Sequence, residues 1–298
     1  MEIAISTKNL TKYYGKNRGV IDLTFQVYKG EVFGFLGPNG AGKTTTTRLL
    51  LDFMHPSSGS AEIFSLDSHQ KSTQIKEFIG YLPGELHLYD SMTGNDFLAF
   101  MASFRKGVDW TFVFNLASRL KADLKIQIRK LSHGNKQKIG LITAFMHKPK
   151  ILILDEPTMG LDPLMQQEFY KLVNEVCDQG TTFFVSSHNL PEVERICDRV
   201  GIIREGRLVV VEDIANLRKR ALRPLEVHFA KPIESKDFEK IAGVKDISIQ
   251  NSILRCTVVG SLDSFIKQLA KYEVVNLISA EPNLEEIFLA FYKQEEKV

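Results

Sequence analysis

The feature that most constrains this chain is a glycine-rich stretch between an apolar run and a helical pattern. It follows the pattern G-x-x-x-x-G-K-[ST] of a phosphate-binding loop and consists of Gly37, Pro38, Asn39, Gly40, Ala41, Gly42, Lys43 and Thr44. Residues 31–36 before it predict a buried strand, and residues 45–51 after it predict a helix. Glycines let successive N–H groups point inward, and a helix N-terminus adds positive potential. The context therefore favours a phosphate site over a simple glycine turn.

Each side chain at the end of this loop has an expected partner. Lys43 should reach the β- and γ-phosphates of a nucleotide, and the Thr44 hydroxyl should ligate Mg²⁺. Thr45 is expected near the α-phosphate. The loop therefore predicts ATP or a related nucleotide as the ligand, with Mg²⁺ beside it.

Two neighbouring carboxylates follow a second apolar run. Residues 151–154 predict a buried parallel strand, and Asp155 and Glu156 come directly after it. Open α/β sheets bind ligands at the C-terminal ends of their strands. We expect Asp155 to contact Mg²⁺ and Glu156 to polarise an attacking water, and the alternative is a surface strand end with two acids.

Three further residues have competing interpretations. Tyr14 is either a half-buried strand aromatic or a platform on which a base stacks. Ser132 is a helix N-cap by default, although a Ser-x-Gly at a helix start is also a good anion site. His188 follows the apolar strand 181–185, at the same kind of strand end as Asp155, but a lone histidine is usually structural.

Composition excludes several classes. The 298 residues carry a net charge of +2, which gives no reason to expect nucleic acid as a partner. The three cysteines form no C-x-x-C, and the seven histidines show no metal-ligand spacing, so neither a disulfide framework nor a zinc site is predicted. The first residues lack the layout of a signal peptide, and no apolar run approaches the ~18 residues needed to span a bilayer. Work at a membrane would require a membrane partner.

Two regions lie outside the loop and the carboxylates. Residues 93–122 have a helical pattern whose apolar face (Phe97, Phe100, Met101, Phe104, Phe112, Leu116, Leu120) is either core or the edge of a partner-docking groove. Pro224 predicts a domain boundary. Beyond it, the order βαββαβα, ending in a helix over 283–292, resembles a ferredoxin-like unit, which we interpret as a regulatory or dimerisation module.

Taken together, the motifs resemble the ATP-binding subunit of an ATP-binding cassette (ABC) transporter over about residues 3–220. The segment Leu131-Ser132-His133-Gly134-Asn135 is similar to the family's signature, Met159-Gly160-Leu161-Asp162 to its dimer-contacting loop, His188 to its switch histidine and Tyr14 to its adenine-stacking aromatic. The resemblance implies an α/β P-loop NTPase of ABC type, residues 1–220, with a mixed sheet core and a helical subdomain at about 90–148. Residues 224–298 would be the small α+β accessory domain.

The resemblance also implies an ATPase that works as a head-to-tail homodimer. ATP would be held between the phosphate loop of one copy and Ser132, His133, Gly134 and Asn135 of the other, with Asp162 in the dimer loop. Lys43, Glu156 and His188 would carry catalysis. A separate multi-span membrane permease would be the partner, so that the subunit would be peripheral, at the cytoplasmic face of the membrane. Tyr81–Glu85, the signature and residues 282–288 resemble a branch of mostly bacterial exporters.

Three segments depart from the family pattern. His133 and Asn135 stand where the signature usually has Gly and Gln. Gly84 stands where a glutamine that bridges Mg²⁺ and the permease is expected, so Glu85 is a candidate substitute and a further metal ligand. Met159 replaces a smaller residue in the dimer loop.

Two alternatives remain open from the sequence. Soluble cassette ATPases of translation usually carry two cassettes, and those of DNA repair insert a long coiled coil, whereas this chain has one phosphate loop and no sustained heptads between Thr44 and Leu131. A nucleotide-gated regulator that hydrolyses little is the other alternative, because Gly84 and Asn135 depart from the pattern.

Overall fold

The computed structural model describes residues 2–220 and 222–279, and the chain divides into two compact units, Met1–Val211 and Glu212–Val298. Each unit has its own hydrophobic core. Pro224, at which the sequence predicts the boundary, lies inside strand β11 (Leu222–Phe229) and is paired there with Thr257. A proline is tolerated at that position because pairing with the strand on the other side begins only at Leu225.

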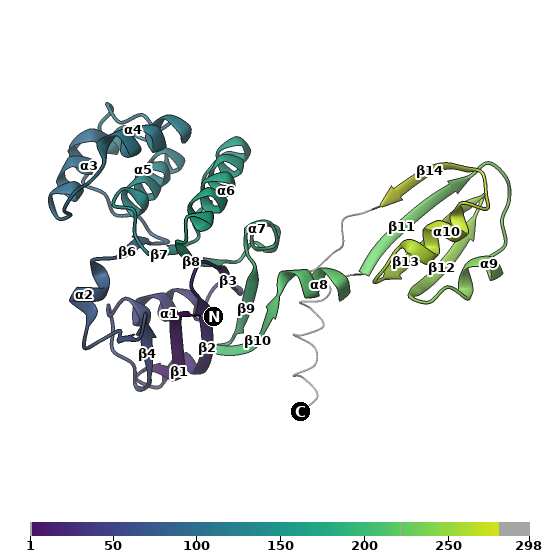
Figure 1. The fold of residues 1–298 in the computed structure, drawn as a ribbon, viewed down its shortest axis with the longest axis horizontal. Coiled ribbons are helices and arrows are strands. Elements are labelled where there is room, and N and C mark those ends of the chain that lie inside the picture. Colours follow the sequence, from purple (N-terminus) through teal and green to yellow (C-terminus); the bar gives the residue numbers. More distant parts are fainter. Residues whose placement is uncertain (1, 221, 280–298) are drawn as a thin grey trace. The chain divides into compact units, whose positions relative to one another are not determined.

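The first unit contains two sheets, as Figure 1 shows. One is antiparallel with the order β2-β1-β4-β5, and its strands are β1 (Ile3–Tyr14), β2 (Asn17–Tyr28), β4 (Ser58–Ile63) and β5 (Leu66–Asp67). The other has the order β10-β9-β3-β8-β7-β6, and its strands are β3 (Val32–Leu36), β6 (Ile79–Leu82), β7 (Ile151–Asp155), β8 (Thr182–Ser187), β9 (Arg199–Arg204) and β10 (Arg207–Asp213). The pairs of β3 with β8 and β9, and of β7 with β6 and β8, are parallel, which brings their C-terminal ends to one edge.

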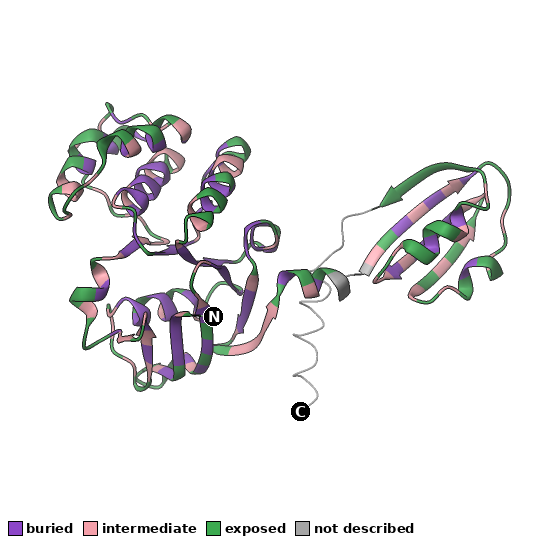
Figure 2. Cartoon of the chain, viewed as in Figure 1, coloured by how far each residue is buried: buried purple, intermediate pink, exposed green. Residues whose placement is uncertain are grey.

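The core of this unit joins the two sheets. Phe25 of the first sheet packs against Phe33, Phe35 and Phe184 of the second, with ring centroids 5.5 to 6.2 Å from its own. The strands β3, β7 and β8 are buried throughout, as the sequence of continuous apolar runs predicts (Figure 2). Strand β2 instead alternates buried and exposed residues, because only one face of its sheet meets this core.

Helices surround the six-stranded sheet. Those outside the subdomain are α1 (Lys43–Leu50), α2 (Ser72–Lys76), α6 (Pro163–Asp178) and α7 (Leu190–Ile196). The helical subdomain consists of α3 (Gly94–Ser103), α4 (Trp110–Arg119), a 3-10 turn (Ile128–Lys130) and α5 (His133–Phe145). Thr93, Asp109 and Ser132 cap the N-termini of α3, α4 and α5 by accepting backbone N–H bonds.

The apolar face expected at 93–122 is only partly core. Phe97, Leu116 and Leu120 are buried, as the core interpretation predicts, but that interpretation is wrong for Phe104, which is 67% exposed. The reason is that α3 ends at Ser103, so Phe104 leaves the buried face and its ring instead packs edge-on against Phe100, 5.0 Å away. Periodicity carried past a helix end therefore overestimated the core.

The second unit contains a four-stranded antiparallel sheet with the order β12-β13-β11-β14. Its elements are α8 (Ile214–Arg220), β11, α9 (Lys236–Glu239), β12 (Val244–Gln250), β13 (Ile253–Val259), α10 (Asp263–Leu269) and β14 (Val274–Ser279). Strand β13 lies between β11 and β12, and β11 lies between β13 and β14, which is the split βαβ arrangement of a ferredoxin-like fold. The helix expected over 283–292 lies outside the described residues.

Candidate functional site

The glycine-rich loop connects β3 to α1 as its sequence predicts. Gly40 and Gly42 have positive φ angles of 78° and 113°, which glycine adopts without strain. A Cβ on Gly37 would lie 2.3 Å from the carbonyl oxygen of Ile203, so no larger residue fits there. Helix α1 begins at Lys43, two residues before the predicted start, and its free N–H groups therefore meet the loop.

Lys43 is buried in the loop, with only 6% of the residue exposed. Its ammonium donates to the carbonyl oxygens of Gly37, at 2.7 Å, and Pro38, at 3.2 Å, and lies 3.5 Å from Oε1 of Glu156. The other oxygen of Glu156 lies 2.9 Å from Nδ1 of His188. The structure therefore brings together the three residues that the sequence assigns to catalysis.

Glu156 is held in an unusual backbone conformation. Its φ of 50° is in the left-handed region, which costs a non-glycine residue energy and often marks a functional site. The Glu156 N–H donates to the carbonyl of Ser186, at 2.9 Å, and Gln137 donates to the carbonyls of Glu156 and Pro157. These bonds fix the direction in which the carboxylate leaves the end of β7.

Two side chains whose oxygen atoms could ligate a metal ion, those of Thr44 and Asp155, lie beside Lys43. The Thr44 hydroxyl donates to Oδ2 of Asp155 at 2.8 Å, and Ser186 donates to the other Asp155 oxygen. Asp155 is only 1% exposed, and each of its two carboxylate oxygens accepts a hydrogen bond. Gly84 lies alongside, since a Cβ there would be 3.1 Å from Oδ2 of Asp155. Carboxylate and hydroxyl oxygens are hard ligands, so this donor set fits Mg²⁺.

Tyr14 lies at the end of β1 and is 45% exposed. Its hydroxyl lies 3.3 Å from that of Thr45 and 3.2 Å from Sδ of Met54. The ring is thus joined to the first turn of α1 while a face remains accessible. Both interpretations made from the sequence fit this position, because the ring is half-buried and also borders the phosphate loop.

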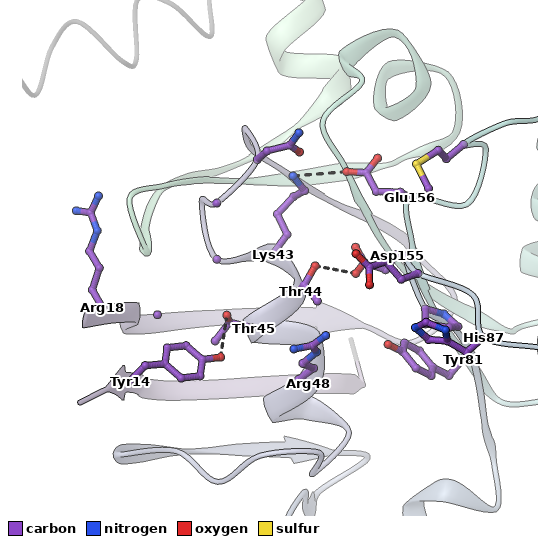
Figure 3. Close-up of a pocket in the computed structure, with 18 residues that line it drawn as sticks. Tyr14, Arg18, Lys43, Thr44, Thr45, Arg48, Tyr81, His87, Asp155 and Glu156 are labelled. Carbon is purple, nitrogen blue, oxygen red and sulfur yellow. Dashed lines mark hydrogen bonds and ion pairs between the residues drawn. The ribbon is translucent and has the colours of Figure 1, made fainter. Parts of the chain in front are cut away.

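Tyr14, Lys43, Thr44, Asp155 and Glu156 line one cavity of about 500 Å³, shown in Figure 3, whereas His188 is not among the residues that line it. Its other lining residues include Arg18, Arg48, Tyr81, Glu85, His87 and Met159. From the sequence, no role was predicted for Arg18, Arg48 or His87. Glu85 is exposed at the rim. Tyr81 is partly buried, and burial together with the nearby Asp155 carboxylate raises its pKa to about 12, so it stays a neutral hydrogen-bonding phenol.

Sequence reasoning missed Gln137 and Ser186. Gln137 is buried on the first turns of α5 and holds the backbone after β7, while Ser186 holds Asp155. The sequence signal for Ser186 was its place at a strand end beside Ser187 and His188. Gln137 carried no such signal, because its partners are carbonyl groups of residues distant in the chain.

The signature segment lies outside this cavity. Ser132 caps α5 by accepting a hydrogen bond from the Asn135 N–H at 3.4 Å, and Ser132 and His133 are exposed. Gly134 packs so closely on Gly160 that a Cβ would lie 2.3 Å from the Gly160 carbonyl oxygen. In the loop that begins at Met159, Asp162 caps α6 by accepting from the Met165 N–H at 3.0 Å. The signature and the dimer loop thus form one surface, and none of Ser132, His133, Gly134, Asn135 or Asp162 lines the phosphate cavity.

Several known proteins are similar to this chain in sequence. The sequence model of the ABC transporter family matches residues 20–159. The bacitracin transport ATP-binding protein BcrA of Enterococcus faecalis is 32% identical over 296 residues, which cover 97% of this chain and 96% of that protein. The chain belongs to the ABC transporter ATP-binding proteins. The linearmycin resistance ATP-binding protein LnrL of Bacillus subtilis is 29% identical over 96% of this chain and 97% of its own length.

Solved structures match the cassette in the same way. The structure of an ATP-binding subunit of an ABC transporter aligns with a TM-score of 0.66 and 28% identity, covering 72% of this chain and 92% of that one. The dimeric cassette MJ0796 aligns with a TM-score of 0.65 over 70% of this chain and 98% of its own, at 20% identity, which shows the shared fold. The predicted ABC fold is therefore confirmed, and as a family member the chain binds and hydrolyses ATP.

Within residues 2–220 and 222–279, no helix combines the length and the apolar character that crossing a bilayer requires.

Proposed function

We propose that this chain powers a separate membrane permease that exports an antimicrobial compound, and that two copies clamp ATP between them. The observation that carries the proposal is the match along almost the whole chain to proteins named for bacitracin transport and linearmycin resistance, combined with an intact phosphate and carboxylate site. The match includes the second unit, so it extends beyond the cassette that all such ATPases share.

The loop and Lys43 are the groups we assign to the phosphates. Backbone N–H groups at the start of α1 and a buried ammonium both favour negative charge. The carbonyls of Gly37 and Pro38 hold that ammonium in the loop, so it is already placed for the β- and γ-phosphates. Tyr14 is assigned to the adenine ring, and Thr45, bonded to the Tyr14 hydroxyl, to the α-phosphate.

Thr44 and Asp155 are assigned to Mg²⁺, with Glu85 as a further candidate ligand. The ion would neutralise charge on the phosphate oxygens when bound. The two principal donors are 2.8 Å apart and face the same cavity. The Ser186 hydroxyl donates a hydrogen bond to the other oxygen of Asp155, so the carboxylate keeps its orientation without the ion.

Glu156 is assigned as the residue that orients and polarises the attacking water. Its carboxylate lies between Lys43 and His188, so one oxygen is near the phosphate-binding ammonium and the other is near the histidine. His188 is assigned as a positioning contact to Glu156 and to the γ-phosphate.

The dimer part of the proposal is supported by the separation of the two motif surfaces. Residues Ser132–Asn135 are at a helix N-terminus and do not line the phosphate cavity, and Gly134 packs against Gly160 of the loop that contains Asp162. A second copy in head-to-tail orientation would supply that helix N-terminus to the γ-phosphate. ATP would then hold the homodimer together and hydrolysis would release it.

The permease is proposed to dock beside β6, which places the subunit at the cytoplasmic face of the membrane. A second cavity of about 260 Å³ lies there, lined by apolar, aromatic and basic side chains that include Phe53, Tyr81, Met101, Arg105 and His147. Tyr81 lines both this cavity and the phosphate cavity, so a permease contact in the second cavity would touch a ring that also borders the phosphate site.

We further propose that residues 1–220 are the ATPase domain and that residues 224–298 are a regulatory or dimerisation module, with no nucleic acid as partner.

Two linked experiments test the export function. The tagged full chain is recovered from gently solubilised membranes of its source cell, and we expect a multi-span membrane protein in stoichiometric amount. The gene for the chain is then deleted and replaced by wild type or by Glu156→Gln. We expect wild type, but not the variant, to restore resistance to a peptide antibiotic of the bacitracin type. Recovery without a membrane protein would contradict the permease, and equal sensitivity of all three strains would contradict antimicrobial export.

A further inference from the structure

Three side chains able to bind a metal meet at the turn that follows α1. Asp52 and His55 belong to this turn, and His69 belongs to the turn after β5. The potential ligand atoms of the three residues all lie within 4.8 Å of one another. Their spacing along the chain gave no metal-site pattern, because the fold of the first sheet brings His69 back to Asp52.

The two imidazoles converge on one carboxylate oxygen. Nδ1 of His69 lies 2.8 Å from Oδ1 of Asp52, and Nδ1 of His55 lies 3.3 Å from the same atom. The imidazole rings themselves have centroids 4.1 Å apart. In a tetrahedral zinc site with ligand bonds of about 2.0–2.1 Å, neighbouring ligand atoms are about 3.3 Å apart. The separations of 2.8 and 3.3 Å from the Asp52 oxygen are therefore close to those of a zinc site.

The backbone around Asp52 gives a second, independent observation. The Asp52 N–H donates to the carbonyl of Leu49, and the Phe53 N–H donates to that of Arg48, so the turn is a Schellman-type helix ending. Asp52 occupies its left-handed position, with φ of 56°, where glycine is the unstrained residue. An aspartate there keeps a strained backbone but gains a side chain, which is only 13% exposed and directed at the two histidines.

The surroundings also hold the other ligands in place. The His69 N–H donates to the Asp67 side chain at 3.0 Å, which fixes the turn that carries this ring. Lys12 donates to the carbonyl oxygen of His55 at 2.6 Å, so the lysine fixes the backbone and its ammonium is already paired there.

We propose that Asp52, His55 and His69 form a binding site for a divalent transition-metal ion of the Zn²⁺ class. Two imidazoles and one carboxylate suit zinc and its neighbours, and they do not suit Mg²⁺, which prefers oxygen ligands. Three protein ligands leave a fourth position for water or for a side chain of a partner. A bound ion would tie the end of α1, whose first residues are Lys43 and Thr44, to the turn after β5.

The test is titration of the full, tag-free chain with Zn²⁺ and with Co²⁺ after chelator treatment, in the absence of nucleotide. We expect one Zn²⁺ per chain by calorimetry and a visible absorption band when Co²⁺ binds. Asp52→Asn and His69→Ala should each weaken zinc binding at least tenfold. Asp52→Gly is the decisive variant, because it removes the ligand while relaxing the left-handed backbone, so loss of zinc cannot be ascribed to misfolding.

Two control variants complete the test. His228→Ala removes a histidine that lies 2.7 Å from Glu226 in the second unit but belongs to no three-ligand group within the described residues. Cys177→Ser removes the cysteine that is not fully buried. Both controls should bind zinc as wild type does. Absence of zinc binding by wild type would overturn the proposal, and so would binding that persists in the Asp52 variants or is lost in Cys177→Ser.

Discussion

Two helices of this chain begin at motifs that the sequence predicts to bind phosphate, and the surroundings of the two helix starts differ. The start of α1 lies in a cavity where Lys43, Thr44, Asp155 and Glu156 are joined to one another by hydrogen bonds and an ion pair. The start of α5, at Ser132, is exposed and makes only a cap bond within the signature. The first helix start has a phosphate cradle around it, whereas the second has only the free N–H groups of a helix end. The difference fits two half-sites that complete each other in a dimer.

The largest expected effect is on the rate of ATP hydrolysis when the Glu156 carboxylate is removed. Glu156→Gln keeps the size of the side chain but removes the charge that polarises water, so we expect phosphate release to fall about 10²- to 10⁴-fold while ATP still binds. Asp178→Asn, at the exposed end of α6, is a matched loss of charge that should leave the rate unchanged. Steady-state phosphate release measures both, and a Glu156→Gln rate near wild type would remove this residue from catalysis.

Lys43→Ala tests the phosphate cradle at α1. Removing a charged hydrogen-bonding group from the loop should weaken ATP binding by about 1.5–3 kcal/mol, or roughly 10- to 150-fold. Titration with a fluorescent ATP analogue measures the affinity. Lys136→Ala, near the start of the other helix, is the control, because its ammonium pairs with Asp90 instead. If both variants bound ATP equally well, the contrast between the two helix starts would be lost.

Tyr14 distinguishes a stacking platform from a structural ring. Tyr14→Ala should weaken ATP binding by about 1–3 kcal/mol if adenine stacks on the ring. Tyr14→Phe keeps the ring and removes the hydroxyl contacts with Thr45 and Met54, so its affinity should stay close to that of wild type. The same titration applies. An unchanged affinity in the alanine variant would return Tyr14 to a purely structural role in β1.

A smaller effect is expected where the signature helix is anchored to the sheet. Nε2 of His147, just after α5, lies 3.0 Å from the Ile79 carbonyl of β6, and burial and the nearby Arg105 lower its pKa to about 4. Because the unfolded chain binds a proton near pH 6.5, stability should be full above that pH and fall as pH drops toward 4. After allowance for partial exposure we expect a loss of about 1–2 kcal/mol. Urea unfolding across this range should show a weaker pH dependence in His147→Gln, and an identical dependence would contradict the assignment.

Much of the fold and the site could be predicted because the signals are local. The glycine pattern required the backbone angles found at Gly40 and Gly42, and the apolar run 151–154 placed Asp155 and Glu156 at a strand end. Ser132 as a helix cap was also readable, since serine satisfies free N–H groups at such a position.

What the sequence could not supply depends on residues that meet only in the fold. The left-handed φ of Glu156 and the bond from Gln137 have no local pattern, and the same holds for the convergence of His69 on Asp52. The core interpretation fails at Phe104 because periodicity does not reveal where a helix ends. Pro224 suggested a break, although strand pairing accommodates it within β11.

The measurement that tests the two half-sites most directly is the mass in solution of Glu156→Gln with ATP and Mg²⁺, with and without Ser132→Arg in the same chain. We expect Glu156→Gln to double from the chain mass of 33.8 kDa, because ATP persists between two copies. The double variant should bind ATP with the same affinity and remain a monomer, since the arginine obstructs only the signature surface. A double variant that still forms the dimer, or a Glu156→Gln chain that stays monomeric at saturating ATP, would contradict the account.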